Sequence, residues 1–87
     1  MSLRIIADKT TKSDNTALIV IEGDSPSEVS SLAARNLATS HAASMGVSRP
    51  GLGLGSGSYP VDAAGNPTQT ASESNKYRYD YPIQGGL

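Results

Sequence analysis

The side chains most able to do chemistry are sparse and scattered in this sequence. His41 is the only histidine, and cysteine is absent. A serine hydrolase needs its nucleophile on a tight turn of the G-x-S-x-G type with a histidine and an acid converging on it, and no serine here has that setting. Asp62, Glu73 and Asp80 are isolated from one another and lack the close spacing of metal ligands. The sequence therefore predicts a non-enzymatic protein that holds no metal or other cofactor, with His41 as a solvated residue near a helix end.

The most unusual stretch is SRPGLGLGSGSYP, residues 48–60, in which every second residue from 51 to 57 is glycine. Its G-x-G-x-G-x-G spacing differs from both phosphate-loop patterns, and it follows a helical pattern instead of leading into one. If the strip is extended, Leu52 and Leu54 share one face and the glycines the other, so a flat protein surface could approach closely. A flexible, solvated connection is the alternative.

The second candidate stretch is KYRYDYPI, residues 76–83, where tyrosines alternate with charged residues. Tyrosine mixed with basic residues is typical of single-strand nucleic-acid binders. However, the basic residues point away from the tyrosine face, and the whole chain has a formal charge of -1. We therefore expect the tyrosines to pack under a helix or to contribute to a protein interface, and not to bind nucleic acid.

The predicted interface combines these two stretches. Its residues are Leu52, Gly53, Leu54, Gly55, Tyr59, Tyr77, Tyr79 and Tyr81. The expected partner is another protein, and a second copy of the same chain also fits.

Three segments have the pattern of β-strands. Residues 3–7 alternate apolar and polar side chains, and residues 16–22 form a β-branched run. The polar residues 9–16 between them predict a turn, so the two strands should form a hairpin. Residues 76–83 predict a third strand, with Pro82 suited to an edge position or to the strand end.

One helix is predicted over residues 26–45. Ser25 is placed to cap it, Pro26 occupies the first helical position, Glu28 lies three residues after the cap and Gly46 ends it. On a helical wheel the narrow apolar side, which we expect to face the sheet, contains Val29, Leu32, Ala33 and Leu37. The opposite side contains Ala34, Ala38 and Ala42, which we expect to be open to a second surface.

These elements predict a single α+β domain over residues 1–87: a small antiparallel sheet in ββαβ order with one helix across a face. Residues 47–75 form a long Gly/Pro/Ser/Thr-rich excursion within it, and a chain of this length has a thin core. No run of apolar residues is long enough for a membrane span, and the start MSLRIIADK has no signal-peptide pattern.

The layout as a whole resembles the small proteins of tailed bacteriophages. The resemblance lies in chain size and in the order of elements: a hairpin, then S-P-S-E leading into an alanine-rich helix, then a Gly/Ser-rich connection. It implies a capsid decoration or cement protein that clamps shell subunits, located in the virion. The alternative is a small inhibitor of a host defence complex, of the anti-CRISPR kind, in the host cytoplasm. A nucleic-acid-binding accessory protein is a third interpretation.

Overall fold

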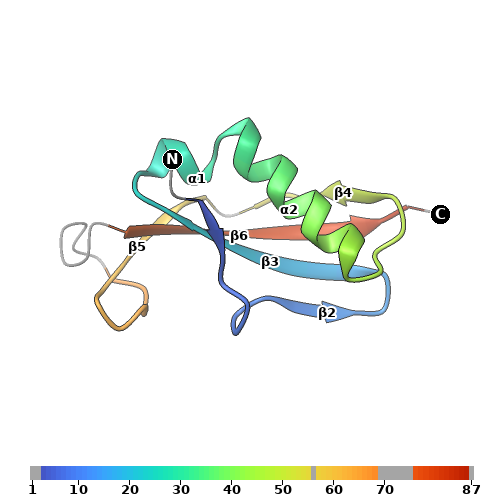
Figure 1. Ribbon diagram of the computed structural model, residues 1–87, viewed down its shortest axis with the longest axis horizontal. Helices are drawn as coiled ribbons and strands as arrows, with labels where there is room; N and C mark the ends of the chain where they lie inside the picture. The colour runs from blue at the N-terminus through green and yellow to red at the C-terminus, as the bar shows by residue number, and fades with distance from the viewer. Residues whose placement is uncertain (1–2, 56, 69–75, 87) are drawn as a thin grey trace.

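The computed structural model describes residues 3–55, 57–68 and 76–86, which form an antiparallel sheet with two helices on one face (Figure 1). The α+β class predicted from the sequence is confirmed. The elements are β1 (Arg4–Ile5), β2 (Thr11–Ser13), β3 (Thr16–Gly23), α1 (Pro26–Val29), α2 (Leu32–Ser44), β4 (Pro50–Leu52), β5 (Tyr59–Val61) and β6 (Lys76–Gly85).

Two long strands, β3 and β6, form the centre of the sheet. They pair antiparallel over eight residues of β3, with Ile19 opposite Tyr81 and Glu22 opposite Arg78. The short strands β1 and β2 both pair with the outer side of β3, while β4 and β5 both pair with the outer side of β6. Each long strand is therefore flanked by two short ones.

The chain order differs from the predicted ββαβ, because three short strands add to the pattern. The predicted turn over residues 9–16 is narrower than expected: β2 occupies Thr11–Ser13, and the turn is left to Asp14, whose φ is 52°, and Asn15. The described parts of the predicted excursion over residues 47–75 contain β4 and β5, which pair with β6. Residues 56 and 69–75 of the excursion lie outside the described residues.

Pro82 lies inside a central strand, and this corrects its predicted place at an edge or strand end. On an antiparallel strand the N–H and C=O of one residue point toward the same neighbour. The Pro82 carbonyl accepts a hydrogen bond from the Gly53 amide at 2.7 Å, so the missing N–H of Pro82 faces the β4 side. The proline therefore costs no hydrogen bond between β3 and β6, and it accounts for the end of β4 at Leu52.

The predicted helix is divided into two by a pair of serines. Ser25 caps α1 as expected, since its hydroxyl accepts from the Glu28 amide at 3.1 Å. After Val29, Ser31 begins α2: its hydroxyl accepts from the Ala34 amide and donates to the Glu28 carbonyl. Gly46 follows the end of α2 with a φ of 101°, as its predicted role as a helix stop requires.

The predicted helix face is correct only in part: Val29 is buried and Leu37 packs against the core as expected, but the alanines that were expected to be open are buried too. Ala34, Ala38 and Ala42 are fully buried against the sheet, whereas Leu32 is 71% exposed. Large side chains of the sheet already fill the space between the sheet and α2. They are Ile19, Ile21, Tyr81 and Ile83. Only a helix face of small residues can lie close to such a surface. The positions of α2 nearest the sheet are therefore alanines.

Candidate functional site

Two regions of the molecule could contact other molecules: the β4 edge with the residues that follow it, and the face of the sheet opposite the helices. We call residues 50–55 the leucine strip, and the second region the open face. The leucine strip contains half of the residues of the predicted interface. The open face contains Tyr59 of the predicted interface, together with Glu22 and Arg78, which the sequence did not single out as site residues.

The leucine strip has two exposed leucines on an edge of the sheet. Leu52 is 43% exposed and Leu54 is fully exposed. Among the described residues, β4 pairs with β6 alone, so its outer side faces away from the sheet. The Gly53 amide points inward to Pro82, and because hydrogen bonding alternates along an antiparallel strand, the amide of Leu52 points outward.

The glycines of this strip lie against the protein itself. A Cβ added at Gly55 would lie 2.6 Å from the Tyr79 hydroxyl oxygen, and one at Gly53 would lie 3.3 Å from the Pro82 carbonyl oxygen. Gly57, which lies beyond the strip, has open space beside it, and its φ of 101° disfavours other residues there. The close approach expected on the glycine side is therefore made by β6, and the leucine side is the one that remains exposed.

The predicted interface tyrosines are divided between the two faces of the sheet. Tyr81 is buried in the core and its hydroxyl donates to the Val29 carbonyl, so it does not contribute to a surface. Tyr79 stacks on Tyr81 with 4.2 Å between ring centroids, and it is partly buried against the core. Tyr77 follows the same alternation and is half-buried. Tyr59 lies on the open face, opposite Arg78, and is separated by the sheet from the other three.

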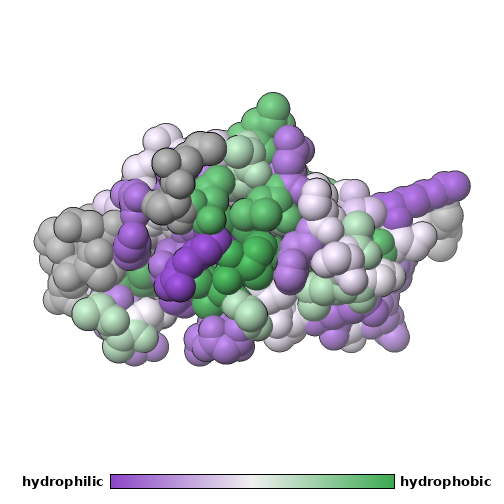
Figure 2. Space-filling view, in the orientation of Figure 1, coloured by the Kyte–Doolittle hydropathy of each residue, from purple (hydrophilic) through white to green (hydrophobic). Residues whose placement is uncertain are grey.

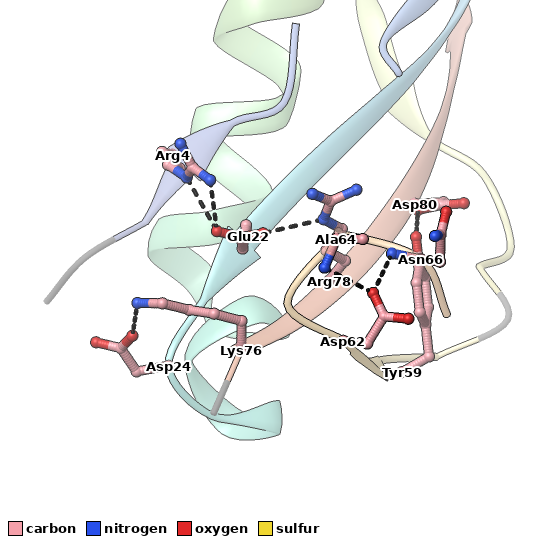
Figure 3. A network of polar contacts seen from close by, with 10 residues as sticks. All are labelled: Arg4, Glu22, Asp24, Tyr59, Asp62, Ala64, Asn66, Lys76, Arg78 and Asp80. Atoms are coloured by element: carbon pink, nitrogen blue, oxygen red, sulfur yellow. Dashed lines mark hydrogen bonds and ion pairs between the residues drawn. The ribbon is translucent and has the colours of Figure 1, made fainter. Parts of the chain in front are cut away.

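A buried carboxylate between two arginines dominates the open face. The strand register places Arg4, Glu22, Arg78 and Tyr59 in one row across β1, β3, β6 and β5. One oxygen of Glu22, whose side chain is 6% exposed, accepts from Arg4 at 2.8 and 3.0 Å. Its other oxygen accepts from Arg78 Nε at 3.0 Å (Figure 3). We call Arg4, Glu22 and Arg78 the charge cluster.

Two further polar pairs flank the charge cluster. The Tyr59 hydroxyl donates to the Asp80 carboxylate at 2.6 Å, and burial together with this hydrogen bond raises the pKa of Tyr59 far above its ordinary value. Lys76 and Asp24 form an exposed ion pair at 2.6 Å, and the hydrogen bond to Asp24 raises the pKa of Lys76. The open face is therefore held together by paired polar groups.

A turn after β5 folds back over Arg78. The Asp62 carboxylate holds it by accepting hydrogen bonds from the Ala64 and Asn66 amides, both at 2.9 Å (Figure 3). Gly65 has a φ of 85°, and a Cβ there would lie 2.9 Å from Arg78 Nη2. Arg78 lines two hollows of about 440 and 240 Å³, and Gly65 lies at the rim of both.

The other candidate residues from the sequence are His41, Asp62, Glu73 and Asp80. His41 is half-buried in the last turn of α2. The part of the chain that the structure describes contains no group of three histidine, cysteine or acidic residues that could hold a metal ion. Asp62 serves the turn, Asp80 bonds to Tyr59, and Glu73 lies outside the described residues. None of the described helices is both long and apolar enough to cross a membrane.

Little in the sequence pattern indicates that the residues of the charge cluster come together. Glu22 ends a β-branched run, and Arg78 belongs to the charged side of the tyrosine stretch. A carboxylate at the end of a buried strand is one sign that a basic partner lies opposite. No protein-family model, curated protein or solved structure matches this chain, so the geometry alone carries the functional argument.

Proposed function

We propose that this chain is a non-enzymatic protein-binding protein that docks through the leucine strip. The observation that carries the proposal is the full exposure of Leu54 next to Leu52 on a sheet edge. Burying a leucine side chain contributes about 1.5–3 kcal/mol, so two leucines form an effective anchor. An edge strand with outward N–H and C=O groups also accepts a strand from a partner.

The glycines fit this mode of docking. Because Gly53 and Gly55 lie against Pro82 and Tyr79, the strip runs close along β6 instead of extending freely into solvent. A strip fixed in this way loses less conformational freedom on binding than a flexible loop would. This supports docking over the flexible-connection interpretation.

The partner that we propose is a shell subunit of a phage particle, with this chain as a decoration or cement subunit. The support is the layout of the chain together with a docking edge suited to adding a strand to a neighbouring subunit. The same edge would serve an inhibitor of a host complex, so the experiment must separate these two partners.

The test uses the double variant Leu52→Ser and Leu54→Ser, and the control is Leu32→Ser, an exposed leucine on α2. Lysate from the producing cells is fractionated by sedimentation, and the chain is followed into particles, host complexes and the free fraction. We expect the wild type to travel with particles and the double variant to bind at least about 100-fold more weakly, with an unchanged melting temperature. The control should bind as the wild type does.

Two results would count against the proposal. If the double variant travels with particles as the wild type does, the leucine strip is not the docking surface. If the wild type travels with a host complex and not with particles, the strip binds protein but the chain is an inhibitor.

A further inference from the structure

We propose that the larger hollow on the open face is a binding site for a carboxylate, with Arg78 as the group that holds it. This inference is independent of the leucine strip. The hollow has a volume of about 440 Å³ and lies between the turn after β5 and the charge cluster. The described residues that line it are Arg4, Glu22, Val61, Asp62, Ala63, Ala64, Gly65, Lys76 and Arg78.

Arg78 carries the argument because only part of its guanidinium group is used. Its side chain is only 10% exposed, and Nε donates to Glu22. Within residues 3–55, 57–68 and 76–86, Nη1 and Nη2 donate to no protein group, and no fully buried side-chain nitrogen or oxygen lacks a partner. In Figure 3 no dashed line ends at either Nη atom. Since Arg78 lines both hollows, these two atoms are open to solvent there.

The Nη atoms are also held in place. Glu22 fixes the guanidinium plane through Nε and is itself anchored on its other oxygen by Arg4. Gly65 leaves room at the Nη2 end, where any side chain would intrude. A buried arginine with a fixed plane and two free donors is prepared for two parallel hydrogen bonds to one acceptor group.

The charge balance favours a monoanion. Among the described residues of the lining, Arg4, Lys76 and Arg78 are cationic and Glu22 and Asp62 are carboxylates, and Asp24 pairs with Lys76 from beside the hollow, so these described charges balance. A carboxylate adds only one negative charge to this balanced site and matches the spacing of the two donors. A phosphate dianion would bring a second negative charge close to Asp62, and this repulsion is uncompensated.

The rest of the hollow suits a small, uncharged group attached to the carboxylate. Its volume is within the ~300–1,000 Å³ range of small-molecule sites. The methyl groups of Ala63 and Ala64 form part of the rim. A short-chain carboxylic acid and the free C-terminus of a peptide share this chemistry, and they are separated below as two probes.

The experiment follows the Arg78 Nε–H and Gly65 amide signals by NMR while ¹⁵N-labelled protein is titrated. The probes are butyrate, acetyl-trialanine with a free C-terminus, the amide of each, and inorganic phosphate. We expect both carboxylates to shift the two signals in a saturable way and both amides to leave them unchanged. Stronger binding of the peptide assigns the site to chain ends, and stronger binding of butyrate assigns it to free acids.

Two variants test the role of Arg78. Arg78→Lys keeps the charge but removes the paired donors, and we expect binding to weaken on the order of tenfold. Because this change also affects the buried contact with Glu22, Ala63→Glu provides a second test at an exposed residue of the rim. Its carboxylate should repel or replace the ligand with a similar loss, whereas the control Ala43→Glu on the outer side of α2 should bind normally.

Three results would overturn the proposal. Phosphate could bind more tightly than either carboxylate, the amides could bind as well as the acids, or Ala63→Glu could bind carboxylate as the wild type does. Each of these would show that paired recognition of a carboxylate at Arg78 does not occur.

Discussion

The two faces of the sheet are stabilised by different kinds of contact. On the helix-covered face, Ile19, Ile21 and Ile83 pack against Ala34, Ala38 and Ala42. On the open face, the turn after β5 folds over Arg78, and the contacts include the buried ion pair of Glu22 with Arg78, the pair of Glu22 with the more exposed Arg4, and a tyrosine-carboxylate hydrogen bond.

The difference shows which face of the sheet has polar groups that could still bind another molecule. On the helix-covered face the large side chains are in contact with one another, and there is no unused polar group among the buried side chains that the structure describes. On the open face, the arginine that stabilises the fold still has two donors to spare. Figure 2 shows hydrophobic residues gathered in the middle of the visible face, with hydrophilic residues on either side.

The largest effect is expected from breaking the charge cluster with Glu22→Ala. This change leaves Arg78 nine-tenths buried without its carboxylate and removes the partner of Arg4. Loss of one member of a buried pair costs about 3–5 kcal/mol, and the access of Arg78 to a hollow places the expected loss of unfolding free energy near 3 kcal/mol. Urea denaturation measures it.

The control for that change is the exposed ion pair of Lys76 with Asp24. Lys76→Ala should lower the unfolding free energy much less than Glu22→Ala does, because both side chains of this pair are exposed to water. Equal losses for the two variants would mean that water replaces Glu22 at no cost, and the open face would then not depend on its buried charges.

A smaller loss is expected from enlarging the helix-covered face with Ala38→Leu. Ala38 is fully buried, so extra carbon atoms there force α2 away from the sheet at a cost of about 1–3 kcal/mol. The matched control is Ala43→Leu on the exposed side of α2, which should stay within about 0.5 kcal/mol of the wild type. Thermal unfolding of both variants tests the contrast, and equal melting temperatures would show that the helix does not lie as close to the sheet as described.

The sequence predicted the elements whose signal is local. The cap at Ser25, the stop at Gly46 and the strand over residues 16–22 depend on neighbouring residues, and all three are present. The helix face was predicted only in part, because a helical wheel ranks hydrophobicity, while the fully buried positions of α2 were decided by the distance to large side chains on the sheet. The break at Ser30 and Ser31 was missed because Ala, Leu and Ser on either side allow one continuous helix.

Of the two candidate regions, the sequence predicted only the leucine strip, whose exposure follows from its amino-acid composition. The leucine strip could be predicted because a leucine between two glycines has no adjacent side chains to cover it. The charge cluster was not, because Glu22 and Arg78 are distant in sequence and meet through the register of β3 and β6. That register depends on the whole sheet, and no local pattern specifies it.

The smallest predicted effect concerns pH and compares tyrosines on the two faces. Burial raises the pKa of Tyr81, and burial with the Asp80 hydrogen bond raises the pKa of Tyr59. A phenol with a folded pKa above its unfolded value of about 10 keeps its proton more tightly in the folded state. Its contribution to stability is therefore complete below pH ~10 and is lost as the pH rises toward the folded pKa.

Removing the Tyr59 hydroxyl should consequently matter at neutral pH and less at alkaline pH. Tyr59→Phe loses the bond to Asp80, which costs about 1 kcal/mol for a half-buried bond to a charged acceptor. Since the variant has no phenol to ionise at this position, its unfolding free energy should fall less steeply than that of the wild type between pH 9 and 11. Asp80→Asn should likewise reduce the steepness, because a neutral acceptor raises the Tyr59 pKa less. Urea denaturation across this range decides the matter: parallel curves for the wild type and Tyr59→Phe would mean that Tyr59 and Asp80 are apart in solution, and the open face would then be looser than the helix-covered one.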